Sequence, residues 1–145
     1  MGNIIMYNLD IKSGQPILPT QAYNNDAGWD LYTSRPAIIP PFSFVDIHTD
    51  ITISLPHDTW GMIMGRSSTV RRYGLRVESA VIDSGYRGEI FIGVWNLTNK
   101  EQNIKLSTRL GQLIILPIIC VTWENACNGL SKSTRSVKGF GSSGE

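Results

Sequence analysis

The 145-residue chain has little cysteine, little net charge and no long apolar run, and each shortage excludes a class of protein. Its two cysteines, Cys120 and Cys127, show no CxxC spacing and are too few for a disulfide framework. The formal net charge of +1 gives no general attraction to nucleic acid, so we expect no nucleic-acid partner. The longest apolar run, from Leu113 to Val121, is broken by Pro117 and is too short to cross a membrane. We therefore expect no membrane partner either.

Several signatures of known chemistry are also absent. The N-terminus lacks the basic segment and apolar run of a secretory signal, which predicts a reduced intracellular setting. The cytoplasm is the expected location, with the nucleus as the alternative for a eukaryotic or viral source. The sequence contains no G-x-S-x-G elbow, no Walker loop and no His/Cys cluster typical of zinc. The two histidines, His48 and His57, are expected in early strands as ordinary surface or core side chains.

Helical periodicity is nearly absent, and only Ser67–Tyr73 is a plausible helix. Short runs rich in Ile, Val, Phe, Trp and Thr alternate with turn-forming residues, a pattern typical of strands. The strand-like runs are Ile4–Leu9, Ala37–Ile39, Phe42–Ile47, Ile51–Leu55, Trp60–Met64, Glu89–Leu97 and Leu110–Val121. They predict an all-β fold, either a sandwich, a jelly roll or a barrel.

The C-terminal segment differs from the rest of the chain. Residues 131–145 are rich in Gly and Ser and contain too few apolar residues to fold on themselves. Within them, Arg135 precedes Phe140, and Gly141, Ser142 and Ser143 follow the ring. Such a segment is either a solvated tail or an arm that orders over a ligand, with phosphate on its amides and hydroxyls and a base on its ring. We therefore divide the chain into a β domain, 1–130, and a flexible arm, 131–145.

An arginine and two serines follow an apolar strand at Gly65-Arg66-Ser67-Ser68. A helix that begins after a glycine offers free backbone N–H groups to an anion, and arginine adds a planar fork suited to phosphate oxygens. The alternative interpretation is an ordinary helix cap formed by Ser67 or Ser68.

A lone carboxylate, Asp83, ends a short apolar run and begins the turn signal Ser84-Gly85. Asp commonly starts a turn, and Gly85 suits a position with positive φ. Asp83 is therefore either a turn residue or a base at the mouth of a pocket. Tyr86, which directly follows Gly85, is either a cross-strand aromatic or a ring that lies under a planar ligand.

Two further polar residues stand beside apolar ones. Asp30 lies between Trp29 and Leu31 with the alternation of a half-buried strand, so it is either exposed to solvent or paired with an arginine. Gln112 directly precedes a strongly apolar strand, where its amide is either an edge group or a phosphate donor.

Taken together and in order, five segments resemble the motifs of the homotrimeric dUTPase family. They are AGWDL at 27–31, GRSS at 65–68, VIDSGYRG at 81–88, RLGQL at 109–113, and the tail from 135 that ends in GFGSSG. Each segment alone is weakly specific. Five in the family's order, with this ending, are highly specific.

The resemblance implies a distorted jelly-roll-like β barrel or sandwich and a homotrimer with three shared active sites. The implied reaction is hydrolysis of dUTP to dUMP and pyrophosphate, which keeps uracil out of DNA and supplies dUMP for dTMP synthesis. Mg²⁺ is expected as the cofactor, held by the triphosphate and waters with no direct protein ligand. The C-terminal arm is expected to close over an active site of the trimer.

The resemblance also implies a role for each residue. Asp83 becomes the general base for the water that attacks the α-phosphorus, and Tyr86 lies under the deoxyribose. Uracil is read by a hairpin between Leu75 and Val81, and Asp30 supports the site by pairing with an arginine. The remaining substrate-binding residues are Arg66, Ser67, Ser68, Val77, Ile82, Gln112, Arg135, Phe140, Gly141, Ser142 and Ser143.

The chain departs from the family pattern at Ala80 and Ser136, where glycine is usual. The extra methyl group at Ala80 is expected to crowd the uracil-reading segment, and Ser136 to stiffen the arm. Two alternatives stay open: the related dCTP deaminase, which needs a catalytic glutamate, and a non-enzymatic binding module that keeps the fold. Glu78 and Glu89 are the glutamates near the expected site.

Overall fold

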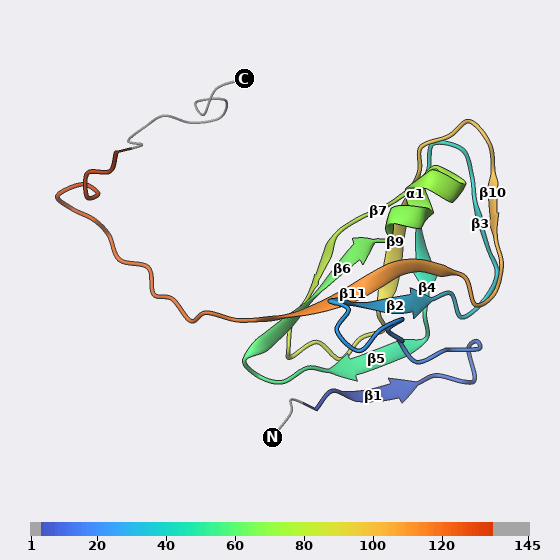
Figure 1. The fold of residues 1–145 in the computed structure, drawn as a ribbon, viewed down its shortest axis with the longest axis horizontal. Coiled ribbons are helices and arrows are strands. Elements are labelled where there is room, and N and C mark those ends of the chain that lie inside the picture. Colours follow the sequence, from blue (N-terminus) through green and yellow to red (C-terminus); the bar gives the residue numbers. More distant parts are fainter. Residues whose placement is uncertain (1–3, 135–145) are drawn as a thin grey trace.

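Strand β11 (Arg109–Pro117) is the centre of the main sheet in the computed structural model, which describes residues 4–134. Its neighbours are β2 (Gly28–Tyr32) and β6 (Thr59–Gly65), and β8 (Ala80–Ile82) extends the sheet beyond β6. All three pairings are antiparallel. Because β11 lies between β2 and β6, it holds together segments that are far apart in the sequence (Figure 1).

A second sheet has the strand order β4-β9-β7, formed by Phe44–His48, Phe91–Asn96 and Leu75–Val77. Two antiparallel two-stranded sheets complete the structure. They pair β1 with β5 and β10 with β3, and their strands are Met6–Leu9, Ile51–Ser54, Gln102–Ile104 and Ala37–Ile39. Connections between distant strands are typical of a jelly roll, so the prediction of an all-β, jelly-roll-like fold is confirmed.

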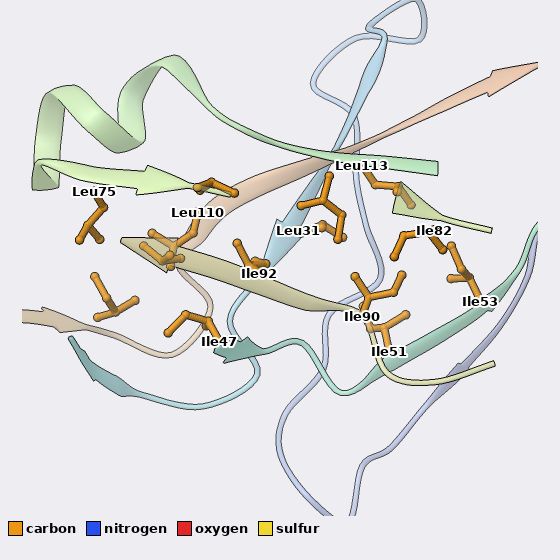
Figure 2. Packing of buried hydrophobic residues seen from close by; sticks show 14 of the residues in the cluster. Leu31, Ile47, Ile51, Ile53, Leu75, Ile82, Ile90, Ile92, Leu110 and Leu113 are labelled. Atoms are coloured by element: carbon orange, nitrogen blue, oxygen red, sulfur yellow. The ribbon is translucent and has the colours of Figure 1, made fainter. Parts of the chain in front are cut away.

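The alternating pattern of the strands determines which side chains form the core. On β9, Ile92 and Val94 are buried while Trp95 points outward. Leu31 and Leu113 of the main sheet belong to the same buried cluster (Figure 2). One apolar core therefore joins the sheets and fixes the register of the strands that carry the candidate residues.

The single helix among the described residues, α1 (Ser67–Tyr73), has the predicted bounds. It ends at Gly74, whose φ of 64° is the left-handed conformation that glycine adopts without strain. The expectation that a serine caps its start was wrong, because the N-cap is Arg66 and no side chain forms a cap hydrogen bond. Instead, the buried Thr69 hydroxyl donates to the carbonyl of Leu110 at 2.7 Å and ties the helix to β11.

Several strand ends differ from the predicted bounds for local reasons. Phe42 has a φ of 50° in the turn before β4, so the strand begins at Phe44. β11 ends at Pro117, which has no N–H to continue the ladder. The three-residue strands β7, β8 and β10 are too short to stand out as periodic runs.

The segment from Leu75 to Val81 does not form the expected hairpin. β7 pairs with β9, whereas β8 pairs with β6, so the two strands belong to different sheets. The amide of Glu78 continues the β7 ladder by donating to the carbonyl of Gly93 at 2.8 Å. The segment is therefore a crossover between the two sheets.

After β11 the chain leaves the sheets, and residues 118–134 extend away from them (Figure 1). All of these residues are exposed, including the free thiols of Cys120 and Cys127. The departure at 118 precedes the predicted domain boundary between 130 and 131, which stays a prediction. Within residues 4–134 no helix has the length and apolar character needed to span a membrane.

Candidate functional site

Strand register brings three of the five sequence segments together at one place on the main sheet. Gln112 on β11 lies opposite Asp30 on one side and Met64 on the other. The adjacent Gly111 lies opposite Gly65, the last residue before Arg66. The first, second and fourth segments therefore meet because β11 pairs with both of its neighbours.

Asp30 is the fixed point of this region. It is 8% exposed, and its two carboxylate oxygens bind two different arginines. Arg66 Nε lies 2.6 Å from Oδ1, and Arg109 Nη1 lies 3.2 Å from Oδ2. A buried carboxylate is costly unless it is paired, and these two partners satisfy it. The predicted pairing of Asp30 with an arginine is confirmed.

Because Asp30 binds Arg66 through its Nε, the two terminal nitrogens of Arg66 can bind other partners. Arg66 Nη1 donates to the Ser68 hydroxyl at 3.4 Å, and the hydroxyls of Ser67 and Ser68 stand at the exposed start of α1. A hollow of about 300 Å³ is lined by Gly65, Arg66 and Ser67, with Val77 on its wall. A guanidinium beside two hydroxyls is a donor set that suits phosphate oxygens.

The Gln112 amide is oriented by its neighbours on both sides. Its Nε2 donates to the carbonyl of Gly65 at 3.0 Å. Its Oε1 lies against Gly28, where a Cβ atom would collide with it. Since an amide nitrogen carries two hydrogens, Gln112 keeps one donor for a ligand next to Arg66.

The third segment forms a compact turn with its carboxylate exposed. The Tyr86 amide donates to the carbonyl of Asp83 at 3.0 Å, which closes the turn. Arg87 Nη1 braces it by donating to the carbonyls of Ser84 and Tyr86, at 2.7 and 2.8 Å. The expectation of a positive φ at Gly85 was wrong, because the glycines with positive φ among residues 4–134 are Gly74 and Gly129.

Tyr86 lies outside the strands, so the cross-strand interpretation was wrong. Its hydroxyl donates to the carbonyl of Glu89 at 2.9 Å, and its ring occupies the space that a Cβ at Gly88 would need. The ring is 41% exposed and lines a second hollow of about 320 Å³ together with Ala80 and Ile82. Its role as the floor under a planar ligand stays a prediction.

The structure thus divides the predicted residues between two hollows. Arg66, Ser67 and Val77 line the first hollow, whereas Ile82 and Tyr86 line the second. The side chain of Val77 is only 8% exposed. Ser68, Asp83 and Gln112 line neither of these two hollows. The predicted residues Arg135, Phe140, Gly141, Ser142 and Ser143 lie outside the described residues.

One contact next to this region was not predicted from the sequence. His48, expected to be remote from the candidate residues, lies with Nδ1 3.1 Å from Glu89 Oε1, and the carbonyl of Glu89 is the acceptor of the Tyr86 hydroxyl. His57 stands in the turn between β5 and β6 and not in a strand. No sequence spacing signals the contact between His48 and Glu89, because the pairing of β4 with β9 creates it.

The described residues around the first hollow offer Mg²⁺ few direct ligands. The nearby carboxylate, Asp30, already binds two arginines with both of its oxygens. The other groups are a guanidinium, whose positive charge repels Mg²⁺, and hydroxyls. Mg²⁺ prefers carboxylate and phosphate oxygens. This donor set suits phosphates that bring their own metal.

Comparisons with known proteins agree on one family. The dUTPase family model matches residues 15–144. A deoxyuridine 5'-triphosphate nucleotidohydrolase of Clostridium tetani is 38% identical over 143 residues, covering 96% of this chain and 98% of the relative. The one of Candida glabrata is 32% identical over 144 residues, covering 99% of each. The structure of Staphylococcus bacteriophage 80alpha dUTPase with dUPNHPP superposes with a TM-score of 0.91 at 26% identity, covering 99% of this chain and 100% of that one.

Proposed function

Because the chain belongs to the dUTPase family and is a dUTP diphosphatase, we propose that its Asp83 is the general base for attack of water on the α-phosphorus of dUTP. The observation that supports this role is the exposure of Asp83 on a braced turn. A general base must reach the water that it deprotonates, and an exposed carboxylate on a rigid turn meets that need.

The phosphates bind at the first hollow. Arg66 is oriented by Asp30, so its terminal nitrogens meet phosphate oxygens with little loss of side-chain freedom. Ser67, Ser68 and Gln112 add neutral donors beside it. Phosphoryl transfer depends mostly on positioning and charge stabilisation, which these groups supply. Mg²⁺ carried by the triphosphate neutralises part of its charge when bound.

The active site is shared between subunits of a homotrimer. Support comes from the placement of predicted residues in two hollows of one chain, since Arg66 and Ser67 line one and Tyr86 lines the other. When two copies meet, the first hollow of one faces the Asp83 turn of its neighbour. The segment from Arg135, with Phe140, Gly141, Ser142 and Ser143, closes over the bound nucleotide.

The nucleoside lies in the second hollow. The Tyr86 ring, fixed through its hydroxyl, packs under the deoxyribose and leaves no room for a 2′-hydroxyl. Main-chain groups between Val77 and Ile82 read uracil from a crossover between sheets. Hydrolysis removes dUTP and so keeps uracil out of DNA, and the dUMP that it forms is the precursor of dTMP. This reaction takes place inside the cell.

A nucleotide panel tests this function. The purified full chain with Mg²⁺ is incubated with each dNTP, and pyrophosphate and ammonia are both measured. Pyrophosphate from dUTP alone is the expected result. Ammonia from dCTP would assign the chain to the deaminase class, and absence of turnover with every nucleotide would leave a binding module.

A further inference from the structure

Three side chains that have no part in the proposed reaction lie close together. They are His48 at the end of β4, Asp50 in the turn before β5, and Glu89 before β9, each of which offers a ligand atom within 4.8 Å of the other two. His48 Nδ1 lies 3.1 Å from Glu89 Oε1 and 3.2 Å from Oε2. An imidazole and two carboxylates form a donor set that binds divalent cations.

Asp50 has an oxygen that the surrounding protein leaves unsatisfied. The residue is 4% exposed, and its Oδ1 binds Arg35 at 2.5 Å. Its Oδ2 is buried and accepts no hydrogen bond from residues 4–134. A buried carboxylate oxygen without a partner is costly, so this atom is poised for a ligand that the protein does not supply.

A cavity lies beside Asp50 and the other two side chains. It has a volume of about 270 Å³ and is lined by Asp50, His48 and Glu89, with Asp10 among its other lining residues. Gly14 packs against Asp50, where a Cβ atom would collide with Oδ2.

Hydrogen bonds hold the Glu89 carboxylate in a position from which it can bind a metal ion. Its Oε1 accepts hydrogen bonds from the amides of Thr49 and Asp50, at 3.2 and 2.9 Å, and these fix the carboxylate toward the cavity. Its second oxygen, Oε2, contacts His48. The side chains of His48 and Glu89 are 40% and 23% exposed, so solvent can reach both of them.

We propose that His48 Nδ1, Asp50 Oδ2 and the Glu89 carboxylate bind one divalent transition-metal cation, with Zn²⁺ as the best representative. The imidazole favours such an ion over Mg²⁺ or Ca²⁺, which prefer all-oxygen sites. Arg35 stays on Asp50 Oδ1 and orients that carboxylate from outside the coordination shell. The two carboxylates neutralise the ion, and water completes its coordination.

The competing explanation for the free Asp50 oxygen is a second hydrogen bond from Arg35. Arg35 Nε is itself buried and donates no hydrogen bond within residues 4–134. A small rotation would join it to Asp50 Oδ2 and make the pair bidentate. In that arrangement Asp50 Oδ2 is no longer free to bind a metal, so the alternative predicts no stoichiometric binding of zinc. The two explanations therefore give opposite results in a binding experiment.

Zinc binding by the full, untagged chain tests the proposal. Cys120→Ser and Cys127→Ser are introduced first, because exposed thiols also bind zinc. Calorimetric titration with Zn²⁺ in chelator-treated buffer is then expected to give one tight site per chain. His48→Gln and Glu89→Gln should each weaken it at least about tenfold, as expected for the loss of one ligand. His57→Gln, at the exposed histidine in a turn, is the matched control and should bind as the parent does.

Circular dichroism shows whether each variant is folded, and Glu89→Gln keeps an oxygen for the amides of Thr49 and Asp50. X-ray absorption on zinc in the parent gives a second measurement that needs no change in the cluster. One imidazole and several oxygens in the first shell are expected. Less than one zinc per chain, equal loss in His57→Gln, or a shell without imidazole would overturn the proposal.

Discussion

Asp30 holds Arg66 by its Nε, at 2.6 Å, and so determines where the rest of the guanidinium points. Asp30 lies on β2 and Arg66 directly follows β6, and these two strands do not pair with each other. β11 lies between them and contributes Arg109 to the other oxygen of the same carboxylate. The arginine that we propose binds phosphate is thus oriented by a buried carboxylate on another strand.

Replacing Asp30 with Asn tests this orienting role. The buried position then holds an amide between two guanidinium groups, and both arginines lose their counterion. Loss of one partner of a buried pair costs 3–5 kcal/mol, and partial exposure of the arginines lowers this to about 2 kcal/mol. We expect that loss in urea unfolding, together with a fall of about tenfold or more in kcat/KM for dUTP.

Asp58→Asn is the matched control, because Asp58 is an exposed carboxylate in a turn. It should leave both the free energy of unfolding and the kinetics of the protein unchanged. If Asp30→Asn lost stability but kept its kcat/KM, Asp30 would be a structural residue only.

Asp83→Asn separates catalysis from binding. Asp83 is exposed, so the substitution should not alter the unfolding midpoint. Removal of a general base lowers kcat by about 10²–10⁴-fold. The Kd for a non-hydrolysable dUTP analogue, measured by calorimetry, should stay close to that of the parent. Undiminished kcat would show that another group activates the water.

The sequence predicted the fold class and the bounds of α1 because both depend on local patterns. Ser67–Tyr73 is a short helix closed by glycine, and the apolar runs match most of the longer strands. The pairing of Asp30 with an arginine was one of two alternatives left open by the residues, and it was the one that the family resemblance favoured.

What the sequence could not show is created by strand pairing. Nothing local reveals that β7 and β8 join different sheets, so the segment between them was expected to be a hairpin. The contact of His48 with Glu89 likewise exists only because β4 pairs with β9. The start of α1 was misjudged because Ser67 and Ser68 are good capping residues, yet neither one forms the cap.

Tyr86→Ala should relax the selection of the sugar. The ring lines the second hollow, and its removal opens room for a 2′-hydroxyl. We expect the ratio of kcat/KM for UTP to that for dUTP to rise about tenfold or more. Tyr86→Phe is the control, because it keeps the ring and loses only the hydrogen bond to the carbonyl of Glu89. An unchanged ratio in Tyr86→Ala would place sugar selection elsewhere.

Ala80→Gly tests whether the extra methyl group crowds the nucleoside. Ala80 is on β8 opposite Ile63 and lines the same hollow as Tyr86. Removing the methyl group should lower KM for dUTP about two- to fivefold, less than 1.4 kcal/mol, with kcat unchanged. Glycine in a strand also costs about 0.5–1 kcal/mol, so the unfolding midpoint should fall slightly. A KM that stays the same or rises would show that the methyl group does not obstruct the ligand.

A chain that ends after Thr134 should fold and assemble yet turn over little dUTP. Among residues 4–134 the buried cluster extends from Leu31 to Leu113, and we expect the truncation to leave the thermal unfolding midpoint unchanged. Activity should fall because Arg135, Phe140, Ser142 and Ser143 are then missing from the arm that we propose closes over the nucleotide. Phe140→Ala in the full chain should give a smaller loss, expressed mainly in KM, because only the stacking contact is removed. Full activity of the truncated chain would rule out the closing arm, whereas loss of the trimer in sedimentation would show that the segment is needed for assembly.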